Sequence, residues 1–271
     1  MAKLQSSEFV GVANRPATIC VDTVCLWFDT TNLKPMASYC SRSGAGVWSA
    51  GGALITARWG LAGAGTQNEG LAIGGVIVNT HQSITEEYNG TSWSAGGALI
   101  VARSRLAGAG TQNAGLAVGG YSSGGAIHSC TEEYNGTSWS VGGALITARR
   151  VLAGAGTQNA GLAMGGTSNI VTSCTEEYNG TSWVAGGAMI VARSCLAGAG
   201  SQNEGLVFST STEEYNGTSW SAGGALITGR YNLAGAGTQG AGLAAGGLTP
   251  TTVSCTEEYL KSSYTIVDCI L

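Results

Sequence analysis

One phrase recurs five times along this chain and constrains its fold more than any other feature. Copies of W-S-A-G-G-A-L-I-x-A-R-x-x-L-A-G-A-G-T-Q, with small departures, begin at Trp48, Trp93, Trp139, Trp183 and Trp220, at intervals of 45, 46, 44 and 37 residues. A second phrase, T-E-E-Y-N-G-T-S-W, lies between the copies, and a last T-E-E-Y ends at Tyr259. A period of this length indicates a repeat protein in which each repeat is one supersecondary unit.

Each repeat reads as a set of four short strands. In the copy around residue 110 these are Leu106–Gln112, Gly115–Gly120, Cys130–Tyr134 and T-S-W-S. Asn135-Gly136, between the last two, predicts a type I′ hairpin turn with positive φ at both central residues. Four strands in about 45 residues without a helical period are typical of a propeller blade.

The composition agrees with that architecture. Gly numbers 45 in 271 residues, without a collagen-like triplet period. Small residues suit inner strands, which converge on a crowded axis, whereas Trp and Tyr fill the wider gaps further out. Only 10% of residues are charged and the net charge is −4, which argues against nucleic acid as a partner. No apolar run is long enough to insert into a membrane, and the first residues lack the apolar region of a secretion signal.

The cysteines and histidines predict neither disulfides nor a metal site. Cys130, Cys174 and Cys255 occupy the same place before T-E-E-Y in different repeats, too far apart to be bridged. No C-x-x-C pair occurs, and the two histidines, His81 and His128, lie in separate repeats. We therefore expect no metal and no cofactor.

The repeat resembles the kelch motif. That motif has a Gly doublet after its second strand, then Tyr, then Trp, then a loop Arg, which here are Gly119-Gly120, Tyr134, Trp139 and Arg149. The resemblance covers about residues 46 to 260 and implies a kelch-like β-propeller of four-stranded blades. One copy departs from it, with Val207-Phe208-Ser209 in place of the doublet, which predicts a stunted second strand or a tightened loop.

The number of blades follows from counting strand motifs. Blocks for the first and second strands begin at Leu61, Leu106, Leu152, Leu196 and Leu233. Aromatic pairs for the third and fourth strands include one more at the start, Tyr39/Trp48, and end with Tyr259/Tyr264. We expect an all-β propeller of six four-stranded blades. Residues 1–50 would then form an atypical, degenerate blade, built on strands such as Val24–Asp29, and residues 51–271 the regular ones. The alternative is five blades plus a separate N-terminal anchoring segment, with residues 1–50 as a docking region.

The paired glutamates of T-E-E-Y are expected to be structural. Adjacent side chains on a strand point to opposite faces, so the two carboxylates cannot converge as a catalytic dyad. An Arg also recurs once per repeat, and we expect one Glu of each pair to bond a neighbouring Arg and fix the packing of the blades. The residues concerned are Arg58, Arg103, Arg149, Arg193 and Arg230, with Glu86, Glu132, Glu176, Glu213 and Glu257.

No catalytic residues are predicted, and the chain is not expected to be an enzyme. Galactose-oxidase-like enzymes share the kelch propeller, but their copper needs histidine ligands that two separate histidines cannot supply. The recurrent G-x-G strings lack a following helix, so they are not dinucleotide fingerprints.

The positions that vary between copies are the candidates for binding. They are the loops between second and third strands and the pairs after each repeat Arg, which share one face in a propeller. Aromatic and polar groups there could bind a sugar or a protein, and simple drift of unselected loop positions is the alternative. The candidate residues are Trp59, His81, Tyr121, His128, Arg150 and Tyr231.

The near-identical repeats are similar to Gly/Ala-rich T-E-E-Y-N-G-T-S-W proteins in the virions of aquatic tailed phages. That resemblance implies a virion component, a tail fibre, spike or capsid decoration, assembled in the host cytoplasm. Its partners would be other virion proteins, copies of itself, or a host-surface glycan or protein. The alternative is a cytoplasmic kelch-type scaffold for protein binding, and a sugar-acting enzyme is the weakest hypothesis.

Overall fold

The chain forms two compact units, Met1–Ala50 and Gly51–Leu271. The structure is a computed structural model that describes residues 18–21, 24–29, 34–39 and 50–261. Apart from a 3-10 turn at Ser123–Gly125 (η2), its described elements are all β-strands. The all-β class expected from the repeat is confirmed.

The second unit contains five consecutive antiparallel meanders, which are numbered here as blades 1 to 5. Blade 1 consists of β4 (Ala62–Gly65), β5 (Gly70–Ile73), β8 (Thr85–Tyr88) and β9 (Trp93–Ala95), with a short hairpin of β6 (Val76–Ile77) and β7 (Thr80–His81) after β5. Blade 2 consists of β10 (Ala107–Thr111), β11 (Ala114–Val118), β12 (Thr131–Tyr134) and β13 (Trp139–Val141). Blade 3 consists of β14 (Ala153–Thr157), β15 (Ala160–Met164), β16 (Thr175–Tyr178) and β17 (Trp183–Ala185). Blade 4 consists of β18 (Ala197–Gly200), β19 (Gly205–Phe208), β20 (Thr212–Tyr215) and β21 (Trp220–Ala222). Blade 5 has three described strands, β22 (Ala234–Gly237), β23 (Ala241–Ala245) and β24 (Thr256–Leu260).

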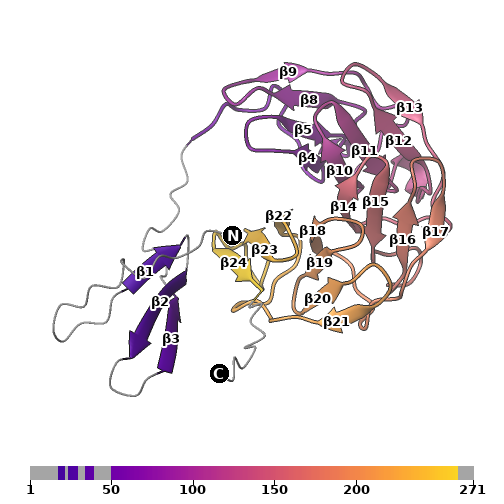
Figure 1. The fold of residues 1–271 in the computed structure, drawn as a ribbon. Coiled ribbons are helices and arrows are strands. Elements are labelled where there is room, and N and C mark those ends of the chain that lie inside the picture. The colour runs from indigo at the N-terminus through magenta and orange to yellow at the C-terminus, as the bar shows by residue number, and fades with distance from the viewer. Residues whose placement is uncertain (1–17, 22–23, 30–33, 40–49, 262–271) are drawn as a thin grey trace. The chain divides into compact units, whose positions relative to one another are not determined.

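The blades are arranged as a β-propeller (Figure 1). The inner strands β4, β10, β14, β18 and β22 pack on one another in chain order around a common centre, and β9, β13, β17 and β21 lie on the rim. The first and last inner strands each keep a face uncovered, since all four residues of β22 are exposed and Gly63 of β4 is exposed. The Ala-Gly sequence of these strands is what allows their close approach. A Cβ on Gly154, for example, would lie 2.6 Å from the carbonyl oxygen of Gly108 in the preceding blade.

Five blades correspond to the second of the two expected arrangements, and the expectation of six is not met. The N-terminal unit is a three-stranded antiparallel sheet of β1 (Thr18–Val21), β2 (Val24–Asp29) and β3 (Lys34–Tyr39). Its third strand reads K-P-M-A-S-Y, so it lacks the Thr and Glu side chains that join one regular blade to the next. Trp48 and Tyr264, the outer aromatics of the first and last expected pairs, lie outside the described residues.

The hairpin between third and fourth strands differs from the turn predicted for Asn-Gly. Tyr134 pairs with Trp139, so the loop has four residues instead of two. Gly136 has a φ of +86°, but Asn135 does not have a positive φ. The Asn135 side-chain oxygen accepts the N–H groups of Thr137 and Ser138, at 3.0 and 2.9 Å. The Asn side chain therefore caps a wider loop, and the type I′ prediction is wrong.

Blade 4 has the tightened loop that its shorter repeat predicts. Phe208 pairs with Ala197 as Val118 pairs with Ala107, so Val207 and Phe208 continue the strand, and it is Ser209 and Thr210 that replace the Gly doublet. The Ser209 N–H donates to the Ser211 carbonyl, and β20 begins at the next residue.

The hydrophobic core lies between the blades. Each of four buried clusters combines one face of a blade with the facing side of the next. The cluster between blades 1 and 2 contains Leu71 and Ile73 from the first, and Leu106, Tyr134 and Trp139 from the second or its linker. Stability of any one blade therefore depends on its neighbours, as expected for repeat proteins.

In blades 2, 3 and 4, three side chains of the blade also donate hydrogen bonds to the preceding blade. Trp183 Nε1 donates to Thr131 Oγ1 at 2.9 Å, and the Tyr178 hydroxyl donates to Glu133. The Gln158 amide donates to the carbonyls of Gly115 and Tyr134, at 3.1 and 2.7 Å. These bonds hold the polar parts of the large aromatic side chains inside the interface.

Candidate binding face

A continuous series of backbone hydrogen bonds connects the variable pairs of successive repeats, which are the two residues after each repeat Arg. The second residue of each pair has a positive φ, in the series Gly60, Arg105, Val151, Cys195 and Asn232. Each of these N–H groups, after the first, donates to the carbonyl of the preceding member, at 2.7, 2.8, 3.1 and 2.9 Å. The first residues of the pairs, among them Trp59, Arg150 and Tyr231, therefore occupy equivalent places at successive blades. We call these pairs and the neighbouring loops between second and third strands the variable face.

The loops are attached to the pairs by isolated β-bridges. Trp59 bridges to Val76, and Ser104 bridges to Tyr121. Arg150 bridges to Thr167, and Tyr231 bridges to Leu248. Both variable regions of the repeat therefore lie on the same side of the propeller, as the sequence predicts.

Three of the candidate residues form a contiguous cluster across blades 1 to 3. The rings of His81 and Tyr121 meet edge to face, with centroids 5.4 Å apart and an interplanar angle of 70°. The Arg150 guanidinium lies over the Tyr121 ring, 4.4 Å from its centroid. A cation in this position is attracted by the quadrupole of the ring, which fixes the guanidinium plane on the phenol.

Trp59 forms a second cation–aromatic pair with a residue that the sequence argument passed over. The guanidinium of Arg105 lies 5.5 Å from the centroid of the Trp59 ring, and 53% of Trp59 is exposed. Arg105 is the second residue of a variable pair, and the variation of this position between copies could have marked it as a candidate binding residue. The structure does not place Tyr231 in either group, although its exposure of 49% leaves the ring accessible.

The two histidines are held by serine side chains. His81 Nδ1 lies 3.0 Å from Ser104 Oγ, and His128 Nε2 lies 2.7 Å from Ser122 Oγ. Burial, and then the charge of Arg105, lower the pKa of His81. Burial is also the first cause that lowers the pKa of His128, followed by the charge of Arg103. Both shifts favour the neutral imidazole, and the cationic groups in the two clusters are the guanidinium groups of Arg105 and Arg150.

The repeat arginines lie below this face and are structural. All five pair with the first Glu of T-E-E-Y in their own blade, in side-chain pairs that are almost fully buried. Arg149 donates to Glu176 at 3.1 Å and to the carbonyls of Cys174 and Ala163, at 2.7 and 3.2 Å. The pairs are Arg58–Glu86, Arg103–Glu132, Arg149–Glu176, Arg193–Glu213 and Arg230–Glu257.

The first Glu also holds the linker that enters its blade. The Glu176 carboxylate accepts the backbone N–H groups of Ile146 and Thr147, at 2.7 and 3.3 Å. A buried carboxylate with several donors is satisfied in its charged form. These carboxylates therefore have their partners within the fold, and those of Glu86, Glu132, Glu176 and Glu213 are at most 3% exposed.

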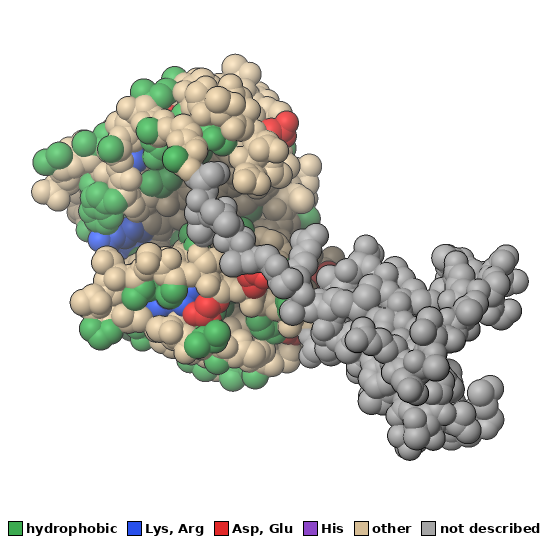
Figure 2. All heavy atoms as spheres, turned by 90° about the vertical axis from the view of Figure 1, so that its left-hand side faces the viewer, with side chains coloured by type: hydrophobic (Ala, Val, Ile, Leu, Met, Phe, Trp, Pro, Cys, Tyr) green, Lys and Arg blue, Asp and Glu red, His purple; other side chains and the backbone are tan. Residues whose placement is uncertain are grey.

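The described residues bring no three His, Cys, Asp or Glu side chains together in a group that could hold a metal ion. No helix among them is long and apolar enough to cross a membrane. The side of the molecule in Figure 2 carries scattered hydrophobic groups and only a few charged side chains, as the 10% of charged residues implies.

No protein-family model matches the chain, and no curated protein matches it. A functional assignment therefore depends on the propeller and on the chemistry of its surface.

Proposed function

We propose that this chain is a non-enzymatic structural and binding protein of a phage virion, as a tail fibre, spike or capsid decoration. The variable face contacts a glycan or protein on the host surface, and the partners in the particle are other virion proteins or copies of the chain. The β-propeller supports a role as an interaction scaffold, because such folds present a loop face on a rigid frame. The cation–aromatic clusters around Trp59 and Tyr121 are the observation that carries the proposal.

The chemistry of these clusters suits a neutral, polar ligand such as a sugar. The exposed indole of Trp59 offers a flat apolar surface, and Arg105 fixes one side of it. His81 and Arg150 supply hydrogen-bonding groups close to the Tyr121 ring, and the buried Ser104 hydroxyl holds the His81 imidazole. Binding sites commonly combine aromatic surface with a few placed polar groups in this way.

A glycan array tests recognition by this face. We expect the purified chain to bind a defined set of glycans and the double variant Trp59→Ala/Tyr231→Ala to lose that binding. Val141→Ala, at an exposed position on the rim strand β13, is the matched control and should bind as the parent does. Absence of binding to every glycan and to intact host cells would contradict a receptor-binding role.

Placement in a virion is tested separately. We expect the chain in purified particles by mass spectrometry, and a propeller-shaped density in images of them. Deletion of residues 1–50 should release the chain from particles if that unit docks it. Unchanged association after the deletion would remove the docking role, and absence from all particles would contradict the virion proposal.

A cytoplasmic kelch-type protein scaffold is the second candidate. It is favoured by Ile170 and Val171, which are exposed in the loop of blade 3 on the variable face. Exposed aliphatic groups are more typical of protein contacts than of sugar contacts. A stable complex with a host protein that Ile170→Ser disrupts would support this function over the first.

A further inference from the structure

Large hydrophobic side chains are exposed mainly on one side of the propeller, which comprises the variable face and the linkers that lead to it. The linkers lie on this side because they follow the loops between second and third strands. The Leu145 N–H donates to the Ser129 carbonyl at 2.8 Å, and the Arg149 N–H donates to the His128 carbonyl at 3.2 Å. We call this side the loop side. Between residues 50 and 261 the large hydrophobic side chains exposed elsewhere are on the outer strands β13, β17 and β24, and they are Val141, Val184 and Leu260.

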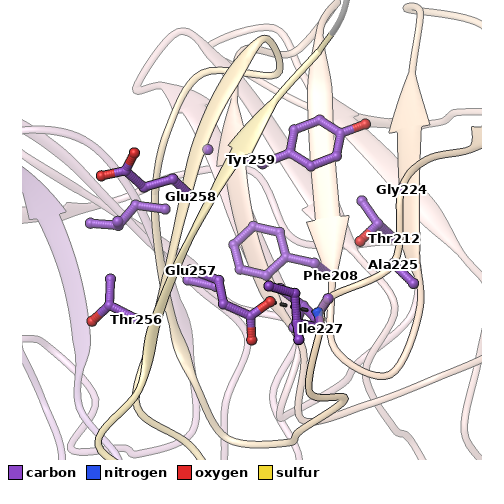
Figure 3. Close-up of a pocket in the computed structure, with 13 residues that line it drawn as sticks. Phe208, Thr212, Gly224, Ala225, Ile227, Thr256, Glu257, Glu258 and Tyr259 are labelled. Carbon is purple, nitrogen blue, oxygen red and sulfur yellow. Dashed lines mark hydrogen bonds between the residues drawn. The ribbon is translucent and has the colours of Figure 1, made fainter. Parts of the chain in front are cut away.

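Each linker exposes one isoleucine, and the fold turns its side chain outwards. The backbone N–H of this residue donates to the first Glu of T-E-E-Y at 2.6–2.7 Å, which Figure 3 shows for Ile227 and Glu257. The preceding residue points into the core, as the buried Leu145 does before Ile146. The isoleucine side chains are 56–93% exposed, in the series Ile55, Ile100, Ile146, Ile190 and Ile227.

The interactions that hold the linker come from the backbone of these isoleucines. A backbone N–H is provided by every residue except proline, so the bond to Glu does not select an apolar side chain. Threonine is also β-branched and would fit an extended linker without exposing as much apolar surface. The isoleucine side chains are therefore available for an external contact.

Val78 is exposed at the tip of a hairpin where its residue type is unfavourable. It lies between β6 and β7, has a φ of +42° and is 87% exposed. A β-branched residue is strained at positive φ, whereas Asn and Gly are common in such turns. Ile170, in the corresponding loop of blade 3, is 75% exposed. The loops thus present protruding apolar side chains, in one case against the preference of the backbone.

The loop side combines this apolar surface with cations. Arg105 and Arg150 are partly exposed there and stack on aromatic rings. The exposed carboxylates of Glu69 and Glu204 lie in turns between first and second strands, at the opposite end of the blades. An anionic surface is therefore attracted by the loop side and repelled by the turns opposite. The loops between second and third strands contain no Asp, Glu, Lys or Arg in residues 76–84, 121–130, 167–174 and 248–255.

We propose that the loop side docks on the surface of an anionic lipid bilayer. The linker isoleucines, Val78 and the exposed indole of Trp59 enter the boundary between headgroups and acyl chains, a depth at which Trp is typical. Arg105 and Arg150 bind the phosphate oxygens of the headgroups. The contact is with one leaflet and needs no spanning segment.

The arrangement of the apolar groups favours a bilayer over a protein partner. They protrude separately from several blades, and the loops between them are rich in Ser, Thr, Asn and Gly. A fluid bilayer accepts such separate insertions at any spacing, whereas the surface of a folded protein would need a matching pocket for each. This inference goes beyond the proposed function, because its ligand is a lipid.

Co-sedimentation of the purified full chain with vesicles of phosphatidylcholine, with and without phosphatidylglycerol, tests the proposal. We expect saturable binding that is stronger when phosphatidylglycerol is present. Ile146→Ser/Ile190→Ser should weaken binding about fivefold to tenfold, because two inserted side chains are lost. Arg105→Gln/Arg150→Gln should weaken binding to the anionic vesicles about fivefold for each arginine and reduce the preference for phosphatidylglycerol.

A matched control removes exposed apolar groups from outside the loop side. Val141→Ser/Val184→Ser changes two exposed residues of the outer strands β13 and β17, so it should bind vesicles as the parent does. All variants should keep the circular dichroism spectrum of the parent. The vesicles contain no carbohydrate, so vesicle binding and glycan binding can each fail while the other succeeds.

Tryptophan fluorescence reports on insertion directly. Emission should shift to shorter wavelength on addition of vesicles, because the Trp59 indole leaves water. The shift should be absent in Trp59→Phe at a lipid concentration that still binds this variant.

Absence of binding to both kinds of vesicle would overturn the proposal, as would equal losses for the isoleucine and valine pairs. Self-association of the chain that Ile146→Ser/Ile190→Ser abolishes, without vesicle binding, would also overturn it and would identify a second copy as the occupant of the loop side.

Discussion

Tyr178 of blade 3 donates its phenolic hydrogen to Glu133 of blade 2, with the two oxygens 2.5 Å apart. The same hydroxyl accepts the Gly143 N–H at 3.1 Å. Glu132, the neighbour of Glu133, points to the other face of the strand and pairs with Arg103 in its own blade. In blades 1 to 4, one carboxylate of each T-E-E-Y therefore bonds within its blade and the other bonds the next blade, because successive side chains of a strand point to opposite faces.

Loss of the Tyr178 hydroxyl should weaken the propeller at one interface. We expect Tyr178→Phe to lower the free energy of unfolding by about 1–2 kcal/mol, because a carboxylate and an amide lose their partner. Urea denaturation followed by tryptophan fluorescence measures this. Tyr88→Phe is the control, since the Tyr88 hydroxyl contacts only the Gly52 N–H, at 3.4 Å, among the described residues. Equal losses for the two variants would contradict the role of the Tyr–Glu bond.

Stability should fall in alkaline solution as the buried tyrosines ionise. Burial, followed by the hydrogen bond to a carboxylate, raises the pKa of Tyr134, Tyr215 and Tyr259 to about 12. The pKa of an unfolded tyrosine is about 10. Because the folded pKa values are the higher ones, the stabilisation is complete below about pH 10 and is lost as the pH rises through about 12.

Two measurements check this pH dependence. The urea midpoint should be constant below about pH 10 and fall above it, and absorbance at 295 nm should show a group of tyrosines that titrates near pH 12. Tyr134→Phe should reduce both the late absorbance step and the slope of the fall. A single absorbance step near pH 10 in the folded protein would contradict the expectation.

The buried ion pair of Arg149 and Glu176 should show strong coupling. We expect Arg149→Met to cost about 3–5 kcal/mol, because it leaves the Glu176 charge buried without its cation. The double variant Arg149→Met/Glu176→Gln should recover part of that loss in a double-mutant cycle. Lys261→Ala breaks a pair whose lysine is 43% exposed and should cost less than about 1 kcal/mol. Additive effects of the two buried substitutions would contradict the coupling.

Val151 occupies a backbone conformation that disfavours it. Its φ of +56° places a β-branched residue in the left-handed region, where the equivalent residue of blade 1 is Gly60. We expect Val151→Gly to raise the free energy of unfolding by about 0.5–1 kcal/mol, because relief of strain exceeds the entropy cost of glycine. Val141→Gly, on an ordinary exposed strand, should lower it by about 0.5–1 kcal/mol. Thermal or urea denaturation measures the sign of the change in the free energy of unfolding for both variants. A Val151→Gly variant less stable than the parent would contradict the argument.

The propeller and its strands could be predicted because they follow from local patterns that repeat. A-G-A-G, G-L-A, T-E-E-Y and W-S-A each form a strand in blade after blade, and the spacing of Arg and Glu anticipated the five buried pairs. The prediction of a type I′ hairpin was wrong because Asn-Gly is typical of two-residue loops, whereas the pairing of Tyr134 with Trp139 leaves four residues in the loop.

By itself the sequence determined the four-stranded blade. The alternation of side chains along each strand, the small residues of the inner strands and the recurring Tyr and Trp are all properties of a single repeat. Only the tertiary structure decided how the variable loops attach to the pairs after each repeat Arg, and which residues stack, as Arg105 does on Trp59. The physical reason is that the core of this protein lies between its repeats. A residue in the first or last blade has the same sequence signal as its equivalents, but a different neighbour.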